Sequence, residues 1–230
     1  MGSSEEGQGL VEYAILISLV AISSLLVLQV FGVSVGQLYC DVAEAINLKS
    51  ACTAKAICED TFDSLDNWKT HYGKPLANQG QVCLSKGVQM YNLCSMEANV
   101  QNYTVRLENA YLYQGDGYGI FFRTSYNAKG ANGYIFQYDP GLKAFVIRKW
   151  INGKEIWQPI AKTPIPKDYP IYNTPHTVEI RVQDNLYTVI LDGEKILEAT
   201  DDTYTKGGIG LRTWDDTQFC GDQISLLSNP

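Results

Sequence analysis

The stretch that decides the fold is HTVEIRVQDNLYTVILDGEKI, residues 176–196. Apolar and polar residues alternate in VEIRV and in YTVIL, which is the period of a strand with one face in a core and the other in solvent. Asp184-Asn185 and Asp192-Gly193 supply the residues that tight hairpin turns prefer. The stretch therefore predicts antiparallel strands joined by short turns.

The same alternating pattern extends beyond this stretch, from Glu59 to the C-terminus. Short alternating runs are separated by Gly, Asn and Asp, and Asn152-Gly153 supplies another tight turn. Fifteen tyrosines and the absence of helical periodicity favour an antiparallel β-sandwich. The expected strands are residues 103–113, 118–126, 132–139, 142–151, 176–184, 186–200, 207–214 and 218–227.

The N-terminal segment differs, because residues 14–38 contain no charged side chain. At ~1.5 Å per residue, a helix of this length would extend for ~37 Å, enough to cross a hydrocarbon core of ~30 Å. A secretory signal peptide is the alternative, but such peptides begin with basic residues, and here Glu5 and Glu6 come first. The expected fold class is α+β: a long N-terminal hydrophobic α-helix over residues 8–38, followed by the antiparallel β-sandwich.

The beginning of this segment, GQGLVEYAILISLVAI (residues 7–22), resembles the processing and assembly motif of the Flp/Tad branch of type IV pilins. The resemblance implies that a prepilin peptidase removes a leader, residues 1–7, by cutting between Gly7 and Gln8. It also implies that Glu12 and Tyr13 act in assembly. Pairing of the Glu12 carboxylate with the new amine of a neighbour's Gln8 would offset the cost of burying that charge.

The resemblance to pilins also implies binding partners and a cellular location for the chain. The chain is expected to lie in the cytoplasmic membrane before assembly and then to form a homopolymer through residues 8–38. The assembled pilus is expected at the cell surface, in the extracellular space.

Six cysteines behind such a segment predict three disulfides formed in an oxidising compartment. They match no recognised metal-binding spacing, and sequence alone does not choose among their pairings. Residues 39–58 are expected to form a helical neck in which Cys40 and Cys52 can be joined. The candidates are Cys40, Cys52, Cys58, Cys83, Cys94 and Cys220.

The order of motifs from TFDSLDNWKTHYG (residues 61–73) and GYGIFFRTSYN (residues 117–127) to GGIGLRT (residues 207–213) resembles the concanavalin A-like jelly roll of laminin-G and related domains. The resemblance covers residues 59–228, so a lectin-like β-sandwich domain is expected over residues 59–230. In that fold the first and last strands pair. The resemblance therefore implies a Cys58–Cys220 bridge and a Cys83–Cys94 loop clamp.

Charge and motif content exclude several functions. A net charge of −7 without a run of Lys or Arg argues against nucleic acid as a partner. The acid clusters that glycoside hydrolases carry on strands are missing, as are nucleophile-elbow and phosphate-loop motifs. His71 and His176 are isolated in sequence. The chain is therefore not expected to be an enzyme.

Aromatic and arginine side chains instead predict contact with a glycan, because ring faces stack on sugars and Arg donates hydrogen bonds in a fixed geometry. The alternative is that these side chains belong to the sandwich core or to subunit contacts. No cofactor or metal is expected, although the loop aspartates Asp116, Asp139, Asp201 and Asp202 make calcium a secondary hypothesis. The candidate glycan contacts are Arg123, Tyr134, Tyr138, Trp150 and Trp157.

The leading hypothesis is a structural subunit of a type IV pilus whose β-sandwich head meets glycans or surfaces. Three alternatives stay open. They are a membrane-anchored carbohydrate-binding protein that never polymerises, a pseudopilin of a secretion system, and an anchored hydrolase.

Overall fold

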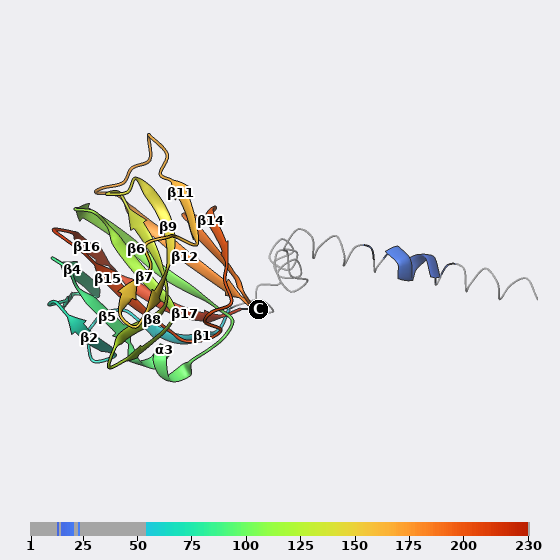
Figure 1. Cartoon of the computed structure of the whole chain (residues 1–230), viewed down its shortest axis with the longest axis horizontal. Coiled ribbons are helices and arrows are strands. Elements are labelled where there is room, and N and C mark those ends of the chain that lie inside the picture. The colour runs from blue at the N-terminus through green and yellow to red at the C-terminus, as the bar shows by residue number, and fades with distance from the viewer. Residues whose placement is uncertain (1–12, 14, 21–22, 24–53, 230) are drawn as a thin grey trace, which may run out of the picture. The chain divides into compact units, whose positions relative to one another are not determined.

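The computed structural model describes residues 13, 15–20, 23 and 54–229 (Figure 1). Residues 15–20 are helical, a run of about 9 Å at 1.5 Å per residue. Within the described residues, no helix is long and apolar enough to cross a membrane. The rest of the described chain is mostly strand, so the predicted α+β class with a long N-terminal helix is wrong, and the fold class is a β-sandwich.

Several predictions for the N-terminal segment lie outside the described residues. Tyr13, from the predicted assembly pair, is described and is helical and exposed. The predicted leader and most of the predicted assembly segment and neck are not described, including Gly7, Gln8, Glu12, Cys40 and Cys52.

Residues 55–229 form one compact unit of two antiparallel sheets. The nine-stranded sheet has the order β14-β13-β12-β6-β16-β4-β3, with β17 also beside β6 and β1 beside β17. Its strands are β1 (Ala56–Asp60), β3 (Leu76–Asn78), β4 (Gln81–Ser85), β6 (Tyr103–Gln114), β12 (Pro175–Gln183), β13 (Leu186–Leu191), β14 (Glu194–Thr200), β16 (Gln218–Gly221) and β17 (Gln223–Ser228).

The eight-stranded sheet has the order β10-β9-β8-β7-β15-β5-β2, with β11 also paired to β9. One short helix, α3 (Leu93–Ala98), follows β5. The strands of this sheet are β2 (Trp68–Tyr72), β5 (Gln89–Asn92), β7 (Tyr118–Asn127), β8 (Gly130–Asp139), β9 (Ala144–Ile151), β10 (Lys154–Glu155), β11 (Ala161–Pro164) and β15 (Gly208–Thr213).

The strands that the alternating pattern predicted are confirmed, with two refinements. The run 186–200 is a hairpin, β13 and β14, that turns at Asp192-Gly193, where both residues have positive φ (53° and 86°). That geometry belongs to the tight turn that these two residues favour. The last run is divided into β16 and β17 at Asp222. The alternating pattern did not predict the short strands β1 to β5, β10 and β11.

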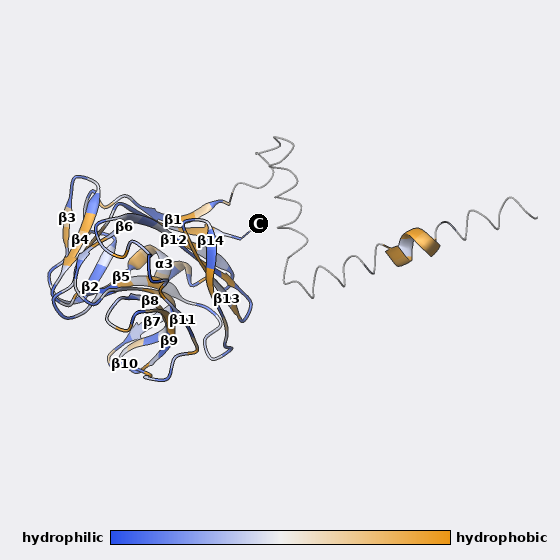
Figure 2. Cartoon of the chain, turned by 90° about the horizontal axis from the view of Figure 1, so that it is seen from above, coloured by the Kyte–Doolittle hydropathy of each residue, from blue (hydrophilic) through white to orange (hydrophobic). Residues whose placement is uncertain are grey.

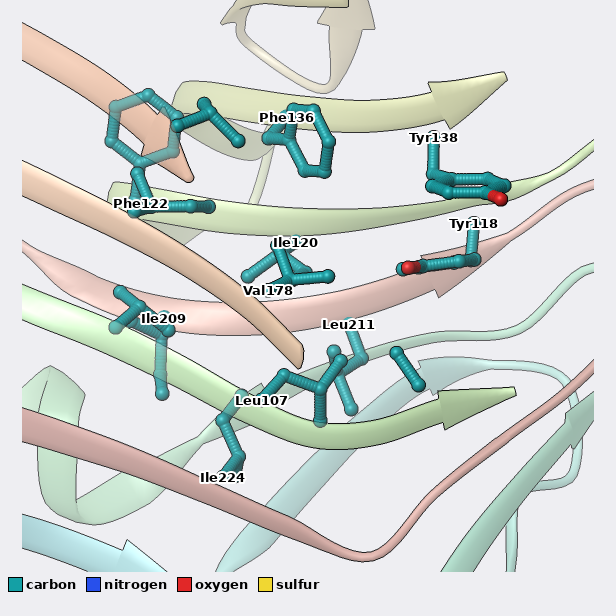
Figure 3. Packing of buried hydrophobic residues seen from close by; sticks show 14 of the residues in the cluster. Leu107, Tyr118, Ile120, Phe122, Phe136, Tyr138, Val178, Ile209, Leu211 and Ile224 are labelled. Atoms are coloured by element: carbon teal, nitrogen blue, oxygen red, sulfur yellow. The ribbon is translucent and has the colours of Figure 1, made fainter. Parts of the chain in front are cut away.

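The core lies between the two sheets. Figure 3 shows Leu107, Val178 and Ile224 of the nine-stranded sheet meeting side chains of the eight-stranded sheet. Fully burying a Val, Leu, Ile or Phe side chain stabilises a fold by about 1.5–3 kcal/mol. Along the strands hydrophobic and hydrophilic residues are mixed, while the connecting loops are mainly hydrophilic (Figure 2). This is the alternation that the sequence predicted for a two-layer sandwich.

The expected pairing of the first and last strands is confirmed, because β1 runs antiparallel to β17. Strand β1 begins at Ala56, so the end of the predicted helical neck is wrong: Ala56 to Cys58 are strand. Because β17 also pairs with β6, β1 joins the nine-stranded sheet beside β6.

The disulfide pairing implied by the jelly-roll resemblance is wrong. Cys83 and Cys220 face each other on neighbouring strands β4 and β16, with a Cα–Cα distance of 4.2 Å, and are bonded. Cys58 bonds instead to Cys94 of α3. Because the neighbouring Ser95 accepts a hydrogen bond from Ile209 of β15, this second bridge ties β1 to the eight-stranded sheet. No described cysteine is free.

Candidate functional site

Three of the five predicted glycan contacts lie in the interior. Arg123, Tyr134 and Tyr138 are at most 1% exposed, so the prediction that they touch a ligand is wrong and the alternative of a core position is right. Along β8 every second side chain faces the core, and Tyr134 and Tyr138 both fall on that side. Trp150 is also buried, whereas Trp157 is 76% exposed.

Along β9, Arg148 and Trp150 alternate with the core residues Phe145 and Ile147, and Arg148 contacts the Trp157 ring. Arg148 and Trp150 therefore lie on the face of the eight-stranded sheet that points away from the nine-stranded sheet. We call it the outer face. A small apolar cluster covers part of it, formed by Tyr91, Phe121, Ala131, Ile135 and Trp150. The outer face is therefore packed with side chains and is not a bare sheet.

A carboxylate surrounded by donors stands on this face. Glu155 Oε1 is 3.3 Å from Arg148 Nε, and Glu155 Oε2 is 3.6 Å from Arg212 Nη1. The Gln137 amide donates to Glu155 Oε2 at 3.1 Å. The Arg148 side chain is only 4% exposed and that of Glu155 23%, so this charge pair is screened less than a surface pair would be.

Tryptophan rings frame the two guanidinium groups. Arg148 lies 4.6 Å from the centroid of the Trp157 ring and also donates to the Trp157 carbonyl oxygen. Arg212 lies 5.0 Å from the Trp150 ring and 5.3 Å from the Trp214 ring. Such cation–π contacts fix the planes of both guanidinium groups. We call the group of Gln137, Arg148, Trp150, Glu155, Trp157 and Arg212 the Glu155 cluster.

Three buried polar atoms of the Glu155 cluster have no hydrogen-bond partner among the residues that the structure describes. They are Gln137 Oε1, Arg148 Nε and Trp150 Nε1. The contact of Arg148 Nε with Glu155 is close enough for an ion pair but lacks hydrogen-bond geometry. Buried polar atoms are nearly always paired, with protein, water or ligand. The cluster therefore holds two donors and an acceptor whose partners are not among the described side chains.

A second set of side chains adjoins the cluster. Tyr72 OH accepts a hydrogen bond from Arg212 Nε at 3.3 Å, and the His71 ring lies beside the Tyr72 ring. His71 Nδ1 is 2.5 Å from Tyr126 OH. We call His71, Tyr72 and Tyr126 the Tyr72 patch. His71 thus has a place beside the site, which its isolation in sequence did not indicate.

The other histidine has a structural role. His176 is buried, with Nδ1 2.6 Å from Asp192 Oδ2 and Nε2 3.0 Å from the Pro170 carbonyl oxygen. Its ring stacks on Tyr169. These contacts hold the segment before β12 against the β13–β14 turn.

Asp201, one of the loop aspartates considered for calcium, has other partners. Burial would raise the pKa of Asp201, but hydrogen bonds from Lys149, Thr203 and Tyr134 outweigh it and lower the pKa to about 2. Lys149 Nζ is 2.6 Å from this carboxylate, so Asp201 forms an ion pair with Lys149. In the described part of the chain, no group of three or more His, Cys, Asp or Glu residues is placed to hold a metal ion.

The pKa of Asp139 is shifted in the opposite direction from that of Asp201. Burial raises its pKa to about 6, although the Leu142 amide and Arg148 favour the charged form. Because the folded-state pKa is above the unfolded value, Asp139 contributes stability below pH ~4 that is lost as the pH rises through about 6. Asp139 follows Gln137 on the same side of β8, so this charge change occurs beside the Glu155 cluster.

A hollow of about 360 Å³ lies elsewhere, between β11 and β14. No aromatic side chain lines it, and Lys195 on its wall is already paired with Glu198. It offers less specific chemistry than the outer face does.

The fold is a concanavalin A-like β-sandwich, because two antiparallel sheets pack face to face and the first strand pairs with the last. The sequence matches the 3-keto-alpha-glucoside-1,2-lyase-like domain family over residues 58–220, more than half of the chain. The chain therefore belongs to that family. No curated protein matches the sequence.

Solved structures agree on the fold. Carbohydrate binding module CBM66 from Bacillus subtilis is similar with a TM-score of 0.58 and 22% identity, covering 70% of this chain and 96% of that one. A galectin-like protein of unknown function from Bacillus subtilis has a TM-score of 0.58 and 14% identity, covering 78% and 100%. The VIP36 exoplasmic/lumenal domain, bound to Ca²⁺ and Man3GlcNAc, has a TM-score of 0.60 and 12% identity, covering 77% and 91%. At these identities the likeness shows the fold alone.

Proposed function

We propose that this domain binds a carbohydrate at the Glu155 cluster. The observation that carries the proposal is the combination, on one face, of a carboxylate, two guanidinium groups and the exposed Trp157 ring. Neighbouring hydroxyls of a sugar both donate and accept, so they match a carboxylate beside an arginine, while the ring face of Trp157 stacks on the C–H face of the sugar. The names of two similar structures, a carbohydrate binding module and a mannoside-bound domain, support this reading.

We propose that the domain binds the carbohydrate without catalysing a reaction on it, although the family's name refers to a lyase. The Glu155 carboxylate is shared among Arg148, Arg212 and Gln137. A carboxylate held by so many donors has little capacity left to take a proton from a substrate. The same contacts hold it rigidly, which favours recognition.

The test is a glycan array probed with the full chain, followed by calorimetry on the strongest ligand. Trp157→Ala is expected to weaken binding about tenfold, the effect of losing one aromatic stacking contact. The matched control is Tyr113→Ala, which removes an exposed ring (44% exposed) from β6 of the other sheet and should leave affinity unchanged. A blank array, or consumption of a 3-keto-glucoside by the wild-type chain, would contradict the proposal.

We also propose that the sequence before the domain presents it at the cell surface as a subunit of a type IV pilus. The support is the motif from Gly7 to Tyr13, together with disulfides that suit a compartment outside the cytoplasm. The partners would be a prepilin peptidase, the cytoplasmic membrane before assembly and other copies of the chain. A membrane-anchored binding protein and a pseudopilin are the alternatives.

The mature N-terminus tests the pilus proposal. Mass spectrometry of chains from surface filaments is expected to find Gln8 as the first residue, and Glu12→Ala is expected to abolish the filaments. Filaments made of chains that begin at Met1 would contradict processing. Normal filaments from Glu12→Ala would favour a simple anchor.

A further inference from the structure

We infer that the outer face takes an oligosaccharide chain in two adjacent subsites, with the Glu155 cluster as the first and the Tyr72 patch as the second. The inference rests on the proposed carbohydrate binding and adds the class of ligand, a chain of at least two sugar units. The second subsite consists of side chains that the first subsite does not use.

The Tyr72 patch is exposed aromatic surface. Tyr72 and Tyr126 are each 39% exposed, and His71 between them is also exposed. The His71 ring lies 5.4 Å from the Tyr72 ring, nearly edge-on, and 4.9 Å from the Tyr126 ring. Three contiguous aromatic rings that remain open to solvent mark a contact surface more often than a core.

The patch is also held in place. Tyr126 OH and His71 Nδ1 are 2.5 Å apart, and the Tyr126 ring packs 5.1 Å from that of Tyr91, which is buried. Gln89 in turn donates to the Tyr91 hydroxyl. Rings that are already fixed lose little conformational entropy when a ligand stacks on them.

Strand register makes the two subsites continuous. Arg212 of β15, Gln89 of β5 and Tyr72 of β2 are register partners on three neighbouring strands, which lie about 4.8 Å apart. Arg212 touches Glu155 through Nη1 and Tyr72 through Nε. A single guanidinium group therefore separates the two subsites, so consecutive rings of one sugar chain can occupy both.

The chemistry of the second subsite suits a neutral sugar unit. It offers ring faces for stacking, the hydroxyls of Tyr72 and Tyr126 and the imidazole of His71. Among the described residues, no carboxylate forms a hydrogen bond or ion pair with these three side chains. The charged groups stand in the first subsite, around Glu155.

The experiment measures affinity against chain length. Calorimetry with the full chain would use the monosaccharide, disaccharide and trisaccharide of the glycan that the array selects. The wild-type chain is expected to bind the disaccharide at least tenfold more tightly than the monosaccharide. Tyr126→Ala should remove this gain, so that the disaccharide binds no more tightly than the monosaccharide, whereas Trp157→Ala should weaken all three ligands.

Two controls separate the outcomes. Tyr126→Phe keeps the ring and loses only the hydroxyl contact with His71, so it should retain most of the gain, and equal thermal stability of the variants excludes misfolding as the cause. Affinity that does not depend on length, or a full gain in Tyr126→Ala, overturns the second subsite while the first survives. Failure of every length to bind overturns the proposed function and this extension with it.

Discussion

Arg123→Met is expected to lower the free energy of unfolding by about 4 kcal/mol, because Arg123 joins three loops from inside the fold. Its guanidinium group is buried and donates to the carbonyl oxygens of Gln101, Asp184 and Tyr204 and to the Tyr187 hydroxyl. Removing it takes the donor from one buried acceptor, the Tyr187 hydroxyl, and from three partly buried carbonyl oxygens, at up to about 1–3 kcal/mol each. Relief from burying a cation offsets part of that loss.

Urea unfolding of the full chain, followed by tryptophan fluorescence, measures this effect. The matched control is Arg106→Met on β6, where the arginine side chain is 44% exposed and forms surface ion pairs with Glu108 and Glu179. That variant should cost less than about 1 kcal/mol. If the two variants were equally stable, Arg123 would not hold the loops together.

Arg123 also shows why sequence pattern misplaced a candidate site residue. Strict alternation from Tyr118, Ile120 and Phe122, which face the core, puts residue 123 on the outer face. Instead the residue has a positive φ of 45°, at an irregularity in the pairing of β7 with β8. Such a bulge turns the side chain to the other face of the sheet. The position of this bulge depends on how the backbone packs, so the local sequence pattern did not predict it.

The tight packing at the bulge is visible at Gly207. A Cβ there would meet the backbone of Arg123 at 2.5 Å, and Gly207 has a φ of 150°, which L side chains rarely adopt. The glycine in the run GGIGLRT therefore serves the bulge as well as the start of β15. This role of Gly207 could not be predicted from the sequence, because residues 123 and 207 are far apart in the chain and meet only in the fold.

The parts of the fold that sequence predicted are those set by local alternation. The strands around VEIRV and YTVIL, and the turn at Asp192-Gly193, needed only the neighbouring residues. The disulfides depended on register: Cys83 meets Cys220 only because β4 pairs with β16. The short strands at the sheet edges carry too few residues for a period to show.

The candidate site was predicted in kind but not in place. Trp150 and Trp157 were selected for their aromatic rings, and both belong to the Glu155 cluster. Glu155 and Arg212 were missed, because each looks like an ordinary polar strand residue. Only the folding of the β9–β10 hairpin back over the face brings Glu155 within 3.6 Å of Arg212.

Glu155→Gln is expected to lower the free energy of unfolding by about 3 kcal/mol and to abolish glycan binding. The change keeps the shape of the side chain but removes the charge that faces two guanidinium groups. Arg148, with a side chain only 4% exposed, would then be a buried cation without its ion-pair partner. Breaking a buried pair from one side costs about 3–5 kcal/mol, and the exposure of Glu155 (23%) places this case at the lower end.

A double variant separates stability from binding. Arg148→Met with Glu155→Leu removes both charges and keeps similar volumes, so it should recover most of the stability, because a hydrophobic pair can replace a buried ion pair at little cost. It should not recover binding, since the acceptor and one of the donors for sugar hydroxyls are gone. Urea unfolding and calorimetry on the same preparations measure the two effects. Restored binding in the double variant would mean that the charges of the Glu155 cluster serve the fold alone, and that Trp157 and the neighbouring rings hold the ligand without them.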